Sequence, residues 1–146
     1  MVGVVLFILI LLFYGFILST DLFRKIFQED KNAQAKTFFD KWDGFSKSES
    51  ARMVLAITGL TVGVWNFFAP NFGAGLSPSI IGAPIPSLIL LLDSIVIFPS
   101  MLGIFNLPQE TKDKISVFMD KYESIAGVLT ILAGILHIAF YKYLLL

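Results

Sequence analysis

The sequence predicts an all-α integral membrane protein with four transmembrane helices, and three observations support this fold class. The 146-residue chain is 56% hydrophobic, and its mean hydropathy is +0.80. Only 15% of its residues are charged, whereas soluble domains carry roughly 25%. The uncharged residues are gathered in long blocks, and a membrane span needs about 20 predominantly apolar residues. Each block is therefore long enough to cross a bilayer.

We expect the four spans at residues 3–20, 51–69, 86–105 and 125–144. No charged residue lies between Val2 and Leu18, between Met53 and Leu92, or between Ser124 and Tyr141. The third span contains Pro99, which should kink it. The first block lacks the basic start and the cleavage motif of a signal peptide, so we expect it to be retained. The alternative is a soluble helical bundle, but its helices would carry a polar stripe that these blocks lack.

The distribution of basic residues predicts how the chain is threaded through the membrane. Ten of its eleven Lys and Arg residues lie in segments 21–52 and 106–124, and the other is Lys142. Basic segments beside spans stay on the cytoplasmic side. We therefore expect both charged segments in the cytoplasm and both termini outside, and a bacterial inner (plasma) membrane is the expected location.

The two charged segments also show the pattern of amphipathic helices. Apolar side chains recur at helical spacing in three groups: Leu22, Phe23, Ile26 and Phe27; Phe38, Phe39, Trp42 and Phe45; Ile115, Phe118, Met119, Tyr122 and Ile125. Such helices lie in the headgroup region of a bilayer, or alternatively pack on a partner protein. The outer loop, residues 70–85, is uncharged and rich in Pro and Gly, and we expect it to pack at the outer interface or to line a vestibule.

Similar segments recur within the single membrane domain, 1–146, which indicates a tandem duplication of a two-helix hairpin unit. The predicted repeats are residues 1–69 and 86–146. Residues 38–42 resemble 118–122, residues 9–13 resemble 88–92, and residues 54–59 resemble 128–134. Each unit holds two spans, so both copies keep one orientation and are related by an axis along the membrane normal. Some transporters have this symmetry.

The candidate functional residues are polar side chains inside the predicted spans. A charged group in the hydrocarbon costs about 2.5–3.5 kcal/mol, so Asp93 needs a compensating environment. At 1.5 Å per residue, Asp93 and the single histidine, His137, should lie at similar depths. The predicted cluster in the outer half of the bundle consists of Asn66, Asp93, Ser94, His137 and Tyr14, which occupies the slot of Asp93 in the other repeat. An Asp–His pair could move a proton or bind a polar solute, or could only fix helix registry.

Four glycines are predicted to allow close helix packing, most simply within the bundle: Gly59, Gly63, Gly127 and Gly134. The absence of cysteine excludes disulfides and thiol catalysis. We recognise no phosphate-binding loop, nucleophile elbow or metal-ligand spacing, and the net charge of zero gives no indication of nucleic-acid binding. The sequence therefore predicts no catalytic residue, no metal and no cofactor.

These observations favour a non-enzymatic accessory or scaffold subunit of a membrane complex, or a homo-oligomer. The expected partners are the lipid bilayer and either another protein or a second copy. The alternative is a small transporter or proton-coupled permeation unit that uses Asp93 and His137. An enzyme that acts on lipid at the interface is a third hypothesis.

Overall fold

A computed structural model describes residues 2–68, 83–104 and 106–140, and these residues form helices joined by short turns, with no strand among them. The elements are α1 (Val2–Leu18), α2 (Thr20–Ile26), η1 (Glu29–Lys31), α3 (Ala33–Ser46), α4 (Glu49–Phe68), α5 (Pro84–Ile97), η2 (Pro99–Ile104) and α6 (Gln109–Phe140). The prediction of an all-α protein is confirmed. The predicted outer loop, residues 70–85, lies almost wholly outside the described residues, as does the end of the predicted fourth span.

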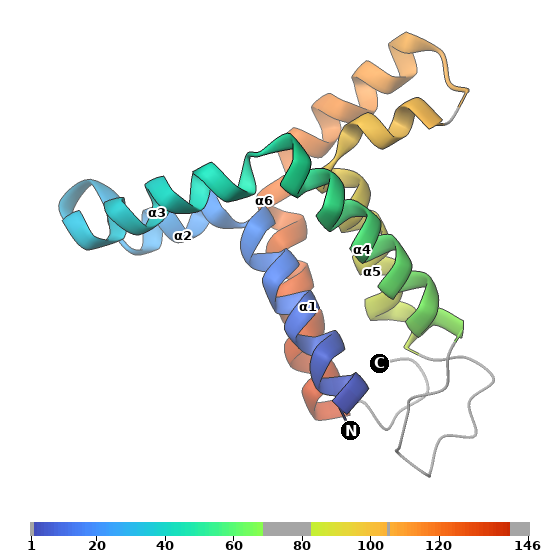
Figure 1. The fold of residues 1–146 in the computed structure, drawn as a ribbon, viewed down its shortest axis with the longest axis horizontal. Helices are drawn as coiled ribbons and strands as arrows, with labels where there is room; N and C mark the ends of the chain where they lie inside the picture. Colours follow the sequence, from blue (N-terminus) through green and yellow to red (C-terminus); the bar gives the residue numbers. More distant parts are fainter. Residues whose placement is uncertain (1, 69–82, 105, 141–146) are drawn as a thin grey trace.

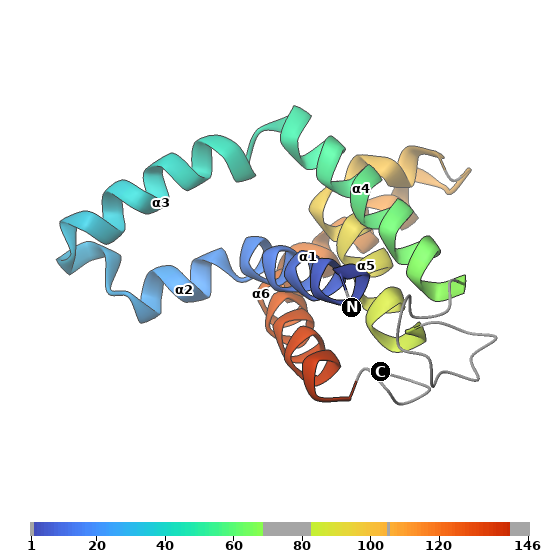
Figure 2. The ribbon, with the colours of Figure 1, turned by 60° about the horizontal axis from the view of Figure 1, so that its bottom comes forward.

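The helices α1, α4, α5 and α6 form a bundle, and two arms project from one end of it (Figure 1). In the bundle α1 packs along α6 and α4 packs along α5, while α5 also contacts α6. The first arm consists of α2, η1 and α3, and the second arm consists of η2 and the first part of α6, to residue 123. Figure 2 shows the first arm from another side, with α2 and α3 reaching away from the bundle. The start of α1 and the end of α6 lie together at the opposite end (Figure 1).

Two of the helices, α4 and α6, are long and apolar enough to cross a membrane. A third crossing is obtained when α1 and α2, which meet at a bend of 74°, are counted as one span. The apolar helix α5 has 14 residues, which gives a length of about 21 Å, against a hydrocarbon core of about 30 Å. The structure is thus compatible with a membrane protein, and the expected number of four spans exceeds what helix length alone supports.

Two helix boundaries differ from the expectation. The predicted kink at Pro99 is instead a helix end, because α5 stops at Ile97 and residues 99–104 form a 3-10 helix. The ring of a proline disfavours helical dihedral angles at the residue before it. Phe98, which precedes Pro99, accordingly has φ −133° and ψ 77°. The predicted fourth span and the amphipathic segment before it are one continuous helix, α6.

Close packing of the helices depends on glycine at two crossings. A Cβ atom built on Gly15 of α1 would lie 2.7 Å from the carbonyl oxygen of Gly127 in α6. A Cβ atom on Gly59 of α4 would lie 2.2 Å from Oγ of Ser94 in α5 and 2.7 Å from Cε1 of Tyr14. The other predicted packing glycines, Gly63 and Gly134, face leucine side chains of α5 and α1. Small residues thus let the bundle close tightly around its core of Phe7, Leu11 and Leu90.

The pattern of buried positions in α1 recurs in α5, 79 residues further on (Tyr14 to Asp93). The buried positions of α1 include residues 7, 8, 11, 14, 15 and 18, and those of α5 are residues 86, 87, 90, 93, 94 and 97. Residues 56, 59 and 63 of α4 are buried, as are residues 127, 130 and 134 of α6, 71 residues further on (Gly59 to Thr130). Both helices of each pair therefore turn the same face toward the bundle.

Candidate functional site

A buried carboxyl group joins α5 to α6 within the bundle. Asp93 is 2% exposed, and its Oδ2 atom accepts a hydrogen bond of 2.6 Å from the hydroxyl of Thr130. The same hydroxyl lies 2.9 Å from the carbonyl oxygen of Ala126. A hydroxyl has one proton, so Thr130 donates to only one of these two acceptors at a time.

Two more residues of the predicted cluster, Ser94 and Tyr14, meet at Gly59. The Ser94 hydroxyl donates to the carbonyl oxygen of Leu90 at 2.7 Å, and the Tyr14 hydroxyl donates to the carbonyl oxygen of Leu55. Tyr14 also lies within electrostatic range of Asp93. The structure therefore brings Tyr14, Asp93 and Ser94 into one region where α1, α4, α5 and α6 meet.

The remaining two residues of the predicted cluster lie closer to the end of the bundle that is opposite the arms. His137 is fully buried, and its ring packs edge-on against Phe7 with 5.4 Å between ring centroids. It lies two turns beyond Thr130 on α6, a rise of about 10 Å. The side-chain amide of Asn66 donates to the carbonyl oxygen of Val62 at 2.9 Å. The backbone carbonyl oxygen of Asn66 accepts from the backbone N–H of Ala83 at 3.1 Å. Asn66 thus connects the end of α4 with the start of α5.

An apolar groove runs between α5 and α6 on the outside of the bundle, with a volume of about 390 Å³. Its walls include Ile89, Leu92 and Val96 of α5 and Leu129 and Leu132 of α6, and among the described residues that line it Asp93 alone is ionisable. Leu92 is 64% exposed, so the groove opens away from the bundle. We name it the α5–α6 groove.

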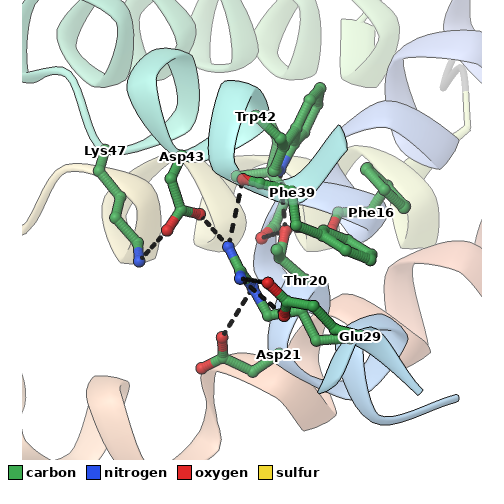
Figure 3. A network of polar contacts seen from close by, with 10 residues as sticks. Phe16, Thr20, Asp21, Glu29, Phe39, Trp42, Asp43 and Lys47 are labelled. Carbon is green, nitrogen blue, oxygen red and sulfur yellow. Dashed lines mark hydrogen bonds and ion pairs between the residues drawn. The ribbon is translucent and has the colours of Figure 1, made fainter. Parts of the chain in front are cut away.

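The first arm is held together by Arg24, whose partners Glu29, Phe39 and Asp43 are labelled in Figure 3. Its Nη1 atom donates to both carboxylate oxygens of Glu29 at 2.8 Å. Its Nη2 atom donates to Asp43 and, at 3.3 Å, to the carbonyl oxygen of Phe39. The guanidinium carbon also lies 5.0 Å from the centre of the Phe39 ring. One side chain of α2 therefore fixes both η1 and α3.

Asp43 is the second charged centre of this network. Its Oδ2 atom lies 2.7 Å from Nζ of Lys47. Partial burial raises the pKa of Asp43, but the hydrogen bonds from Lys47 and Arg24 outweigh this effect and hold the pKa below its ordinary value of 3.8. Asp43 is therefore ionised at neutral pH and ties α3 to Arg24.

An aromatic side chain of α3 covers the end of α1 that lies next to the arms. The indole N–H of Trp42 donates to the Thr20 hydroxyl at 3.0 Å. Its ring contacts Phe16 and Phe13, with centroids 4.9 and 5.9 Å apart. The predicted amphipathic helix thus buries part of its aromatic face against the chain itself, while Phe38 and Phe45 remain exposed.

Sequence reasoning missed Thr130, Gly15 and Arg24. Thr130 is an ordinary residue in an apolar helix, and only its place on the buried face could have paired it with Asp93. Gly15 has no second glycine at a spacing of four, so no motif marks it. Arg24 was counted only as one of several basic residues of its segment.

The comparisons with known proteins give a family but no activity. Residues 4–137 match one family model, which carries no functional description. No curated protein and no solved structure matches the chain. Because the match covers most of the bundle and both arms, the chain belongs to this family of uncharacterised proteins.

Proposed function

We propose that this chain is a non-enzymatic accessory or scaffold subunit of a membrane complex. The observation that carries the proposal is the α5–α6 groove, an apolar surface open to the outside of the bundle with Asp93, itself 2% exposed, among its lining residues. Ionisable residues within a membrane normally face a bundle interior or a partner. A helix of another subunit would give Asp93 such a surrounding.

We infer that all four bundle helices cross the membrane, with both arms on the cytoplasmic side. The inference is supported by α1 and α5 lying alongside α6 and α4, and by both arms projecting from one end (Figure 1). The segments that form the arms, residues 21–52 and 106–124, hold ten of the eleven basic residues, and such segments remain in the cytoplasm.

The orientation predicts opposite labelling of two single-cysteine variants in intact bacterial cells. The chain has no cysteine of its own, so Gly3→Cys and Lys36→Cys each introduce one thiol. A membrane-impermeant maleimide should label Gly3→Cys, at the end of the bundle opposite the arms, and should label Lys36→Cys only after lysis. The reverse pattern would contradict this orientation.

We also propose that the two halves arose by duplication of a two-helix hairpin, related by an axis along the membrane normal. Support comes from the recurring burial pattern, in which Tyr14 corresponds to Asp93 and Gly59 to Thr130. Tyr14 lies against Gly59, just as Asp93 binds Thr130. For the second helix of each unit, the burial pattern pairs residues that are 71 positions apart, whereas the sequence matches pair residues that are 74 positions apart. The two registers differ by three residues, or about one helical turn.

Two further contacts support the same register. Gly63 of the first half faces the side chain of Leu91 in the second, and Gly134 of the second half faces Leu12 in the first. Arg52 and Glu123, also 71 residues apart, lie 3.9 Å from each other. A residue that meets its own equivalent lies close to a twofold axis. Aligned relatives whose halves matched in a different register would contradict the duplication.

A small transporter or permeation unit is a second candidate, and the observation that favours it is the pattern of buried positions that recurs in the two halves. Repeats related by an axis along the membrane normal occur in transporters, which bind their substrates between the repeats. Tyr14 and Asp93, which occupy equivalent positions, lie within electrostatic range of each other at such an interface.

One purification separates the two candidates. The tagged protein is extracted from its native membrane in a mild detergent, and the intact assembly is weighed by mass spectrometry. A subunit should emerge in a fixed ratio with larger membrane proteins, and the pure chain in liposomes should carry no proton or solute flux. Purification as a lone chain that dissipates a proton gradient, with loss of that flux in Asp93→Asn, would instead establish the transporter.

A further inference from the structure

We propose that the α5–α6 groove binds a single transmembrane helix of a different membrane protein, and that this helix places a basic side chain against Asp93. The inference rests on the proposed subunit function and names the chemistry of the partner. Two independent observations carry it: the incomplete hydrogen bonding of Asp93, and the difference between the two halves of the chain.

The first observation concerns the carboxyl group. An ionised carboxylate has about four acceptor positions, and the described residues supply one hydrogen bond, from the Thr130 hydroxyl to Oδ2. The carbonyl oxygen of Ala126 competes for the same proton. A single hydroxyl does not offset the removal of a charge from water, whereas an ion pair with further hydrogen bonds can. A Lys or Arg opposite Asp93 would supply both charge and donors.

The second observation concerns the equivalent place in the first half. There Tyr14 reaches across to α4 through its hydrogen bond to the carbonyl oxygen of Leu55. The neighbouring ring of Phe13 packs against Trp42 of α3. The first half therefore closes this place with its own aromatic side chains.

In the second half Asp93 is itself only 2% exposed, but the surface beside it is left uncovered. Asp93 replaces the longer Tyr14, and Leu92, which corresponds to Phe13, is 64% exposed. Tyr122, which corresponds to Trp42 in the sequence repeat, contacts Phe118 on its own helix and is itself exposed. By analogy with the first half, the missing cover is a helix, and here another chain must provide it.

A second copy of this chain does not fit the groove as well. Residues 2–18, 53–92 and 124–141 contain no Lys or Arg. The apolar stretches that could enter the groove from a second copy therefore hold no Lys or Arg side chain to face Asp93, and their one histidine, His137, is fully buried. The occupant is a different protein with a basic residue inside an otherwise apolar span.

The test uses a defined probe. A synthetic transmembrane peptide of leucine and alanine carries one central Lys, and a matched peptide carries Leu at that position. Binding to the purified full chain is measured by energy transfer in liposomes of neutral lipid. The Lys peptide should bind at least about tenfold more tightly than the Leu peptide, which is the effect of a modest charge pair.

Three variants locate the binding. Asp93→Asn should remove the preference for Lys. Leu132→Trp fills the groove without changing charge and should weaken binding of the Lys peptide. Val64→Trp is the matched control, because Val64 is a similarly exposed apolar residue on α4, and it should leave binding unchanged. Thermal unfolding in detergent checks that each variant is folded. If Asp93→Asn does not fold, Leu132→Trp still tests whether the peptide binds in the groove.

Equal binding of both peptides, or a Lys preference that survives Asp93→Asn, would overturn the proposal. So would weaker binding in Val64→Trp but not in Leu132→Trp. If the native protein still emerged with larger subunits, the assignment of the groove would be wrong and the subunit function would stand. If it emerged alone, the subunit function itself would be wrong.

Discussion

Gly127→Ala is expected to disrupt the packing of α1 against α6 and to destabilise the bundle by about 3 kcal/mol, the upper part of the range for overpacked cores. The added Cβ would lie 2.6 Å from the carbonyl oxygen of Gly15 and 2.6 Å from the backbone nitrogen of Ser19. Both neighbours are backbone atoms, so α1 must move as a whole to make room. At Gly59 the close atoms belong to the side chains of Ser94 and Tyr14 and not to a backbone.

The control for this prediction is Gly44→Ala. Gly44 also lies inside a helix, α3, but a Cβ atom built on it meets nothing within 4 Å. Alanine there should be neutral or should stabilise the helix by up to about 1 kcal/mol, because it lowers the entropy cost of helix formation. Thermal unfolding in detergent measures both variants. Equal melting temperatures for the two would show that α1 and α6 are not in backbone contact.

Arg24→Met is expected to release the first arm, with a loss of about 1–3 kcal/mol for hydrogen bonds to charged partners. The Arg24 side chain is 18% exposed and binds Glu29, Asp43 and the carbonyl oxygen of Phe39. Methionine keeps much of the apolar contact and removes the charge. Hydrogen exchange of residues 20–46 should rise strongly, while exchange in the bundle should change little.

Lys114→Met is the matched control in the second arm. The Lys114–Glu110 pair has a short N–O distance of 2.6 Å, but its side chains are 76% and 79% exposed. Exposed pairs contribute about 0–1 kcal/mol, so this variant should behave like the wild type. If Lys114→Met loosened its arm as much as Arg24→Met does, burial would not be the source of the Arg24 effect.

Acid should loosen the first arm in the same way as Arg24→Met. The folded-state pKa of Asp43 is held below 3.8, so its contribution to stability is present above the unfolded value. That contribution is lost as the pH falls through the lower folded value. Exchange in residues 33–46 should therefore rise below about pH 4 in the wild type, and the rise should be smaller in Asp43→Asn.

The sequence predicted the helical class and the amphipathic segments, because long uncharged blocks and helical spacing report directly on burial. It did not predict where α6 begins. The stretch before Glu123 is charged and the stretch after Ser124 is apolar, but neither contains a proline that would break the helix. The change from charged to apolar residues suggested a boundary between two helices where the helix is continuous.

The candidate site was predictable in its residue types and less so in its pairing. Estimated depth placed Asp93 near His137, but depth carries no information about which helix faces are adjacent. In the structure the hydrogen bond to Asp93 comes from Thr130, two turns away from His137. Hydroxyl side chains in helices usually bond to the carbonyl four residues back, so nothing in the sequence marked Thr130 as different.

The continuity of α6 makes the two arms mechanically unlike. With 32 residues the helix is about 48 Å long, and it carries both the second arm and one wall of the α5–α6 groove. The first arm is separated from its bundle helices by a 74° bend after α1 and by a break between Ser46 and Glu49. A load on the first arm can be absorbed at these joints, whereas a tilt of the second arm acts as a lever on the groove wall that contains Leu129 and Leu132.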